Sequence, residues 1–178
     1  EHALAWAVAR AGHDVVVTPG NAGIPWSGDE PDDADLYVLG PEDHITSGLG
    51  DRLRAEGKVV FGAGADGGQL EGSKAWMKDL LAEAGVPTAR YGTFTDLAEA
   101  KAFMRTLHGG VVVKTDYLAA GKGVLVTDSY AEASADAEAK LAGGAIVVEE
   151  LLTGPEVSLF AVCDGERAVA LPLCQDHK

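Results

Sequence analysis

The sequence is poor in cysteine, and this scarcity argues against two classes of protein. Only two cysteines, Cys163 and Cys174, occur among 178 residues, and neither belongs to a CxxC motif or a cysteine–histidine pair. A disulfide-stabilised scaffold and a structural zinc site are therefore not indicated. Both cysteines are interpreted as small hydrophobic residues on strands.

Positive charge and long apolar runs are also scarce. The chain carries 14 lysines and arginines against 28 aspartates and glutamates, a formal net charge of -14. Such a charge repels phosphate backbones and anionic lipids, so neither nucleic acid nor a membrane is an expected partner. No apolar run approaches the roughly 20 residues of a membrane span, and no charged-then-apolar leader begins the chain. A cytoplasmic protein is therefore predicted.

The most informative stretch runs from Val111 to Val126, where two β-branched runs flank a loop of small residues that contains Gly-Lys-Gly. Backbone amides in such a loop can approach an anion closely. Lys114 ends the first run and needs a partner for its charge, because lysine is rarely buried alone. For Gly-Lys-Gly alone an ordinary hairpin is the better explanation, but Lys114 shifts the balance toward a polyphosphate, which would satisfy both features. The loop is not a Walker A motif, since Asp116 and Gly123 break that pattern.

A second glycine pattern, residues 62–67 (GAGADG), matches GxGxxG between a predicted strand and a predicted helix. This arrangement can bind a dinucleotide, but the pattern is weak by itself. The acidic residue expected at the end of a second strand is missing, because Glu83 falls inside a predicted helix. A dinucleotide site is therefore not favoured.

Hydrophobic periodicity predicts an alternating α/β chain. The predicted helices span residues 1–10, 47–56, 74–84, 96–107 and 130–141. The predicted strands span residues 14–18, 36–39, 58–61, 90–94, 145–148, 157–163 and 166–174. Ser73 is expected to cap the helix that starts at Lys74. Lys78, one turn further along, is interpreted as a surface residue.

Several segments resemble phosphoribosylamine–glycine ligases, a family of ATP-grasp enzymes. They are residues 19–23 (PGNAG), 40–42 (GPE), 69–74 (QLEGSK), 85–89 (GVPTA), 114–124 (KTDYLAAGKGV), 149–158 (EELLTGPEVS) and 175–178 (QDHK). The resemblance covers nearly the whole chain, but the chain covers only the front part of the family pattern. A fragment is expected, without the N-terminal glycine-rich loop and without the C-terminal metal-binding part.

The resemblance implies an α/β fold with two parts. Residues 1–68 would form an incomplete, Rossmann-like N-terminal lobe of the kind that precedes ATP-grasp domains. Residues 69–178 would form an ATP-grasp domain that is incomplete at its C-terminus. Within it, a small α+β lid is expected at residues 88–149.

The same resemblance implies ATP-dependent ligation of glycine to 5-phosphoribosylamine, a step of de novo purine biosynthesis. The products would be glycinamide ribonucleotide, ADP and phosphate, formed through a glycyl phosphate intermediate. Mg²⁺ or Mn²⁺ is implied as the metal, with its ligands expected beyond Lys178. The partners would be the small-molecule substrates, and a monomer is expected, although the sequence leaves the oligomeric state open.

The resemblance also assigns residues. Those implied in ATP binding are Lys74, Lys114, Gly121, Lys122, Gly123, Glu149, Glu150, Leu151, Leu152 and Glu156. Catalysis is assigned to Lys114 and Lys178. Substrate binding is assigned to Gly20, Asn21, Ala22, Gly40, Pro41, Glu42, Asp176 and His177. The backbone of residues 149–152 would pair with the adenine edge, and Glu156 would accept hydrogen bonds from the ribose hydroxyls.

Three departures from the family pattern keep alternatives open. Tyr117 replaces the usual glycine, Pro155 replaces the usual glutamate, and residues 24–34 look shortened relative to the family. One alternative is another ATP-grasp carboxylate–amine ligase with a different acceptor. A second is a degenerate nucleotide-binding module without catalysis. The 178-residue segment alone is predicted to be inactive.

Overall fold

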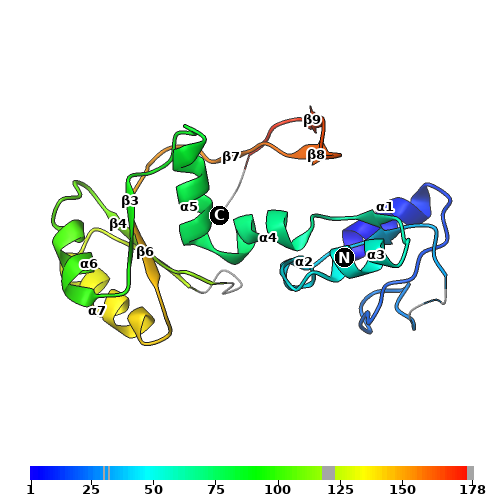
Figure 1. Cartoon of the computed structure of the whole chain (residues 1–178), viewed down its shortest axis with the longest axis horizontal. Coiled ribbons are helices and arrows are strands. Elements are labelled where there is room, and N and C mark those ends of the chain that lie inside the picture. Colours follow the sequence, from blue (N-terminus) through cyan, green and yellow to red (C-terminus); the bar gives the residue numbers. More distant parts are fainter. Residues whose placement is uncertain (30, 32, 118–122, 176–178) are drawn as a thin grey trace.

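The computed structural model describes residues 1–29, 31, 33–117 and 123–175. The molecule is elongated, with the N-terminal elements at one end and a helix-covered sheet at the other (Figure 1). Two consecutive helices, α4 (Ala65–Gly72) and α5 (Lys74–Glu83), join these ends.

The N-terminal part combines short helices with a minimal parallel sheet. Its elements are α1 (His2–Arg10), β1 (Tyr37–Val38), α2 (Glu42–Thr46), α3 (Leu49–Ala55), β2 (Val60–Phe61) and α4 (Ala65–Gly72). β1 pairs with β2 in parallel, with Tyr37 opposite Val60. The helix α3 between them provides the crossover that parallel strands require. These elements confirm the predicted alternation of helix and strand at residues 36–61.

Two predictions in this part are wrong. Residues 14–18 form no strand, since Val17 makes only an isolated parallel bridge to Ser27. A β-branched run becomes a strand only when a neighbouring strand pairs with it, and the β1–β2 sheet does not extend to Val17. The predicted helix 47–56 starts only at Leu49, after a left-handed Gly48, and a separate short helix precedes it.

The opposite end is an antiparallel sheet covered by two helices. Its elements are β3 (Tyr91–Phe94), α6 (Leu97–Met104), β4 (Val111–Thr115), β5 (Val124–Thr127), α7 (Tyr130–Leu141) and β6 (Ile146–Glu150). The strand order is β3–β6–β4–β5. α6 and α7 cover one face, where Met104, Val113, Ile146 and Val148 are almost completely buried. This arrangement confirms the predicted order of strands and helices in the region.

The second face of this sheet meets α5 (Lys74–Glu83), which contacts β6. Side chains alternate between the faces of a strand, so the neighbours of buried Val113 and Val148 point away from α6 and α7. Lys114 on β4 and Glu149 on β6 are therefore on the α5 side. Figure 1 shows α5 beside the sheet, between it and the N-terminal part.

The C-terminal elements are short. They are β7 (Val157–Ser158), β8 (Ala161–Cys163), β9 (Ala168–Ala170) and β10 (Cys174–Gln175). β8 pairs with β9, and β10 pairs with β7, both antiparallel. The predicted strands 157–163 and 166–174 are therefore wrong as continuous strands, because each is interrupted. β8 and β9 form a hairpin in which Asp164 donates its N–H to the carbonyl of Arg167, so the tip is Gly165–Glu166. The Asp164 carboxylate accepts N–H bonds from Glu166 and Arg167, which explains why the acidic residue lies before the tip.

No helix among the described residues is both long and apolar enough to cross a membrane. The predicted domain boundary between residues 68 and 69 falls within α4. The division into two parts stays a prediction.

Candidate anion-binding site between helix α5 and the sheet

The first turn of α5 is joined to the end of β4. Ser73 caps the helix, because its Oγ accepts a hydrogen bond from the backbone N–H of Trp76 at 3.1 Å. The Asp116 carboxylate, just after β4, accepts from the N–H of Ala75 at 2.8 Å and from the Ser73 hydroxyl at 3.1 Å. A carboxylate is favoured at a helix N-terminus by the helix dipole. These bonds fix the residues that follow β4 against the start of α5.

Lys74 projects from the same turn toward the residues after β4. Its Nζ donates to the carbonyl oxygen of Tyr117 at 2.7 Å. Burial lowers the pKa of Lys74 below its ordinary 10.5, because the ammonium has lost part of its hydration. The positive charge of Lys114 lowers this pKa further, whereas the charge of Asp116 opposes the change. Lys74 is thus a partly desolvated cation beside a second cation.

Glu149 lies between two ammonium groups. Its Oε1 is 2.9 Å from Lys114 Nζ, and its Oε2 is 3.1 Å from Lys78 Nζ. Lys78 also donates to the hydroxyl of Thr88 at 2.7 Å. Lys78 and Glu149 are only 4% and 5% exposed. The interpretation of Lys78 as a surface residue is therefore wrong, because β6 packs against the face of α5 that carries it.

The site thus holds three lysines. Lys78 is buried, whereas Lys74 and Lys114 remain partly accessible, and a quarter of the Lys114 side chain is exposed. Two lysines on one carboxylate leave a net positive charge, and Lys74 adds to it. A buried carboxylate with two cations can be stable, because each charge has a partner at short distance. The arrangement is chemically suited to an anion with several oxygens.

The backbone predicted to pair with the adenine edge begins at Glu149 and ends at Leu152. Glu150 donates its N–H to the Arg90 carbonyl at 2.9 Å, and Leu151 donates to Gly110 at 3.0 Å. The Glu150 carboxylate accepts from the Arg90 N–H at 2.8 Å. An adenine edge at this stretch would therefore have to use other backbone groups than these two N–H groups. Leu152 and Glu156 are exposed, and the nucleoside assignment stays a prediction.

The predicted substrate residues of the N-terminal part form two local structures. Asn21 accepts the N–H of Gly23 on its side chain at 2.9 Å, and it exchanges backbone bonds with the Ser27 hydroxyl. Gly20 adopts φ +64°, where a Cβ atom would lie 2.4 Å from Ser27 Oγ. Ala22 is exposed beside them. The loop is thus closed on itself by local hydrogen bonds.

The Gly40-Pro41-Glu42 segment is a helix entry. Pro41 occupies the N-cap of α2 in an extended conformation, and Glu42 lies in the first turn. A Cβ atom at Gly40 would meet the Glu1 side chain at 3.1 Å. Glu42 also lines a cavity of about 160 Å³ with residues of α2 and α4. Its role in substrate binding stays a prediction.

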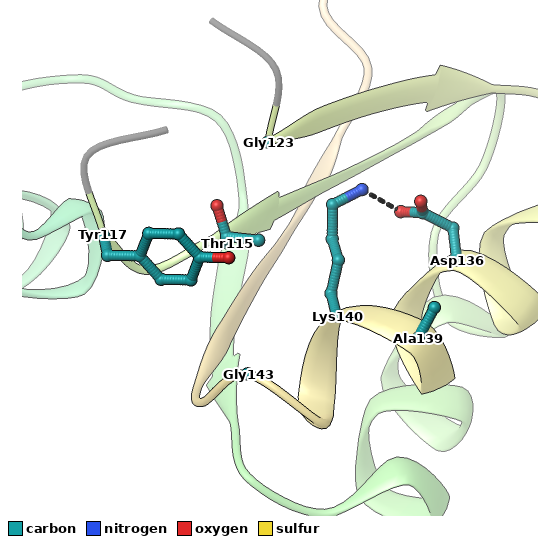
Figure 2. Close-up of a pocket in the computed structure, with 7 residues that line it drawn as sticks. All are labelled: Thr115, Tyr117, Gly123, Asp136, Ala139, Lys140 and Gly143. Atoms are coloured by element: carbon teal, nitrogen blue, oxygen red, sulfur yellow. Dashed lines mark hydrogen bonds and ion pairs between the residues drawn. The ribbon is translucent and has the colours of Figure 1, made fainter. Parts of the chain in front are cut away.

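A larger pocket lies on the opposite face of the sheet from Lys114 and Glu149. Its volume is about 490 Å³. Figure 2 shows the residues that line it, which are Thr115, Tyr117, Gly123, Asp136, Ala139, Lys140 and Gly143. Lys140 pairs with Asp136 one turn earlier on α7, so the charge of this cation is already neutralised. Of the predicted site residues, Gly123 lines this pocket. The lysines around Glu149 therefore offer a better anion site than this larger pocket.

The GxGxxG segment holds carboxylates where a dinucleotide would place its pyrophosphate. At the start of α4, Ala65 donates its N–H to Asp51 and Gly67 donates to Asp66, both at 2.7 Å. A Cβ atom at Gly68 would lie 2.8 Å from Ile45, so this glycine permits close packing of α4 on α2. These contacts support the sequence argument against a dinucleotide site.

Five predicted site residues lie outside the described residues, namely Gly121, Lys122, Asp176, His177 and Lys178. Within the described part of the chain, no group of three or more histidine, cysteine, aspartate or glutamate side chains could hold a metal ion. The sequence did not reveal the roles of Lys78 and Asp116. The spacing of Lys74 and Lys78 by one helical turn was the available signal that both belong to one face of α5.

Residues 72–178 match the family described as phosphoribosylglycinamide synthetase, ATP-grasp (A) domain. The chain belongs to this family. A phosphoribosylamine–glycine ligase of Caulobacter vibrioides is 42% identical over 202 residues, covering 100% of this chain and 47% of that protein. The corresponding ligase of Escherichia coli K12 is 40% identical and is covered to 48%. The chain thus spans about half the length of the curated relatives that it matches.

Solved structures agree with this family assignment. A phosphoribosylamine–glycine ligase from Thermotoga maritima superposes with a TM-score of 0.77 at 30% identity, covering 97% of this chain and 46% of that chain. A D-alanyl-alanine synthetase from Vibrio cholerae superposes with a TM-score of 0.66 at 16% identity, which shows the shared fold alone. The alignment of 202 positions with the Caulobacter ligase exceeds the 178 residues of this chain, so that relative has residues that this chain lacks. The α/β ATP-grasp fold is thus established.

Proposed function

We propose that this chain is the nucleotide-binding half of a phosphoribosylamine–glycine ligase. The observation that carries the proposal is the match of the whole chain to curated ligases at 40–44% identity. The two partly accessible cations Lys74 and Lys114, near the junction of β4 and α5, support it, because both can meet the oxygens of a polyphosphate. Under this proposal residues 1–68 form the substrate lobe, residues 69–178 the ATP-grasp domain and residues 88–149 its lid.

The proposed reaction proceeds in two steps. A carboxylate oxygen of glycine attacks the γ-phosphorus of ATP, the bond to the β,γ-bridging oxygen breaks, and ADP leaves. The amine nitrogen of phosphoribosylamine then attacks the carbonyl carbon of glycyl phosphate, loses a proton and displaces phosphate. Enzymes accelerate phosphoryl transfer mainly by positioning the reactants and by neutralising charge.

We assign Lys74 and Lys114 to the phosphates of ATP. Both ammonium groups lie beside the junction of β4 and α5, and phosphate oxygens would replace the hydration that Lys74 has lost. Gly121, Lys122 and Gly123 would cover the phosphates, and residues 149–152 with Glu156 would hold the nucleoside. Asp176, His177 and Lys178 would border the acceptor, with Lys178 as a catalytic group.

Mg²⁺ or Mn²⁺ would neutralise phosphate charge during transfer. The described residues offer no cluster of ligands for such an ion. We therefore assign no metal ligand among them and derive no step through the metal. The expectation that its ligands follow Lys178 stays a prediction.

The deciding experiment measures ADP release by the protein that contains this chain, with ATP and Mg²⁺ present and each remaining substrate omitted in turn. Release that needs both glycine and phosphoribosylamine supports the proposal. ATP binding without dependence on either substrate would contradict it and would favour a sister ligase or a binding module. Lys114→Met should abolish release, whereas Lys58→Met, which removes a surface lysine paired with Asp33, should not.

We also propose that the 178 residues alone are catalytically inert. The same assay on the isolated segment should give no glycine-dependent ADP. Glycine-dependent ADP production by this segment would contradict that proposal while leaving the ligase assignment intact.

A further inference from the structure

Lys78 is a buried cation that the proposed mechanism does not use. Its side chain is 5% exposed, and its Nζ is held by Glu149 Oε2 at 3.1 Å and by the hydroxyl of Thr88 at 2.7 Å. The ring of Tyr91 lies 5.5 Å from the same Nζ. A lysine is rarely buried in this way, because removing an ammonium from water is costly unless a counter-charge meets it. With these contacts in place, Lys78 is not positioned to contact a ligand in solvent.

Its counter-charge is shared with Lys114. Glu149 Oε1 lies 2.9 Å from Lys114 Nζ, and the Lys114 side chain is 25% exposed. The charge of Lys114 also acts on Lys74, because it contributes to lowering the pKa of Lys74. One carboxylate therefore serves two ammonium groups, one buried and one accessible.

Removing Lys78 would change this balance. Glu149 would keep Lys114 as its ion-pair partner, and the two charges would cancel toward any approaching anion. With Lys78 present, the group of three carries a net positive charge that is available at Lys114. Charge–charge energies are large at these distances, because Glu149 and Lys78 are almost completely shielded from water.

We propose that Lys78 is a positioning residue for phosphate binding: it neutralises Glu149 from the buried side and so leaves the charge of Lys114 available to the nucleotide. This inference rests on the proposed function, because it takes the ligand to be the polyphosphate of ATP. Lys78 acts through Glu149 and Lys114, and it does not itself contact the ligand.

The test measures the affinity for ATP by isothermal titration calorimetry on the protein that contains this chain. Circular dichroism gives the folded fraction of each variant, so that affinities are compared per folded molecule. Lys78→Met should weaken ATP binding by about tenfold or more, because Lys114 becomes neutralised by Glu149. The double variant Lys78→Met/Glu149→Gln removes both charges, so its affinity should return to within about threefold of the unmodified protein. Lys58→Met is the control, since Lys58 lies in the N-terminal part and pairs with Asp33.

Two outcomes overturn the inference. An unchanged affinity per folded molecule in Lys78→Met would assign Lys78 a structural role only. A double variant as weak as the single variant would show that Glu149 does not mediate the effect.

Glu149→Gln alone tests the inference even when Lys78→Met does not fold. Lys114 then lacks its carboxylate, so ATP should bind at least as tightly as to the unmodified protein, and tenfold weaker binding would overturn the inference. The proposed adenine contact of Glu149 uses its backbone, which this change preserves. Failure of the proposed function is seen separately, as absence of ATP binding or of substrate dependence in the unmodified protein.

Discussion

At the scale of single residues, Lys74 carries the clearest chemical signal of the site. Its pKa is lowered chiefly by burial and secondly by the charge of Lys114, while Asp116 opposes the change. A lowered pKa means that part of the Lys74 population is neutral at alkaline pH, below the ordinary 10.5. A phosphate bound beside it would favour the charged form and raise the pKa again.

We therefore expect ATP binding at alkaline pH to be accompanied by proton uptake. Calorimetry in buffers of different ionisation enthalpy measures the number of protons taken up. Lys74→Met should remove this uptake, and Lys58→Met should retain it, because Lys58 lies in the N-terminal part and pairs with Asp33. Uptake that persists in Lys74→Met would contradict the assignment.

At the scale of elements, the start of α5 depends on one hydroxyl with two tasks. Ser73 Oγ accepts from Trp76 N–H and donates to Asp116. Ser73→Ala removes the cap and the bond that ties the end of β4 to α5. We expect a loss of about 1–2 kcal/mol in the free energy of unfolding, measured by urea denaturation.

Ser129→Ala is the matched comparison. Ser129 caps α7 by accepting from Glu132 N–H at 3.3 Å. Its removal should cost about 1 kcal/mol and less than the removal of Ser73. Equal losses in both variants would contradict a stabilising role for the Ser73–Asp116 bond.

The strands also differ in how well their amide hydrogens are expected to be protected from exchange with solvent. β4 and β6 lie in the middle of the four-stranded sheet and are mostly buried, whereas β8 and β9 have three residues each, all exposed. Local opening needs little free energy where few apolar contacts are lost. Amide hydrogens of β8 and β9 should exchange at least about a hundredfold faster than those of β4 and β6. Similar rates in a hydrogen-exchange measurement would contradict this expectation.

At the scale of the whole molecule, the net charge of -14 produces self-repulsion in the folded state. Salt screens charges on the surface more strongly than the buried pairs of Glu149. We expect the melting temperature to rise when sodium chloride is increased from about 0.01 M to about 0.3 M. A melting temperature that falls over this range would show that surface ion pairs stabilise the fold more than repulsion destabilises it.

Signals that act within a few residues were sufficient for much of the fold. The β-branched run at Val111–Val113 gave β4, the Ser73 cap marked the start of α5, and α7 matches its predicted span of residues 130–141. Caps, β-branching and apolar periodicity are local properties, so they are readable without knowing what packs against an element. The same locality made residues 14–18 misleading, because a strand also requires a partner.

The sequence by itself determined the family and the order of elements in the sheet-rich half, and it predicted Lys74 and Lys114 as site residues. Only the tertiary structure decided that Lys78 is buried, that Glu149 serves two lysines and that Asp116 binds the start of α5. The physical reason is that exposure and ion pairing depend on which surfaces meet. α5 and β6 are far apart in the chain, and their packing alone brings Lys78 to Glu149.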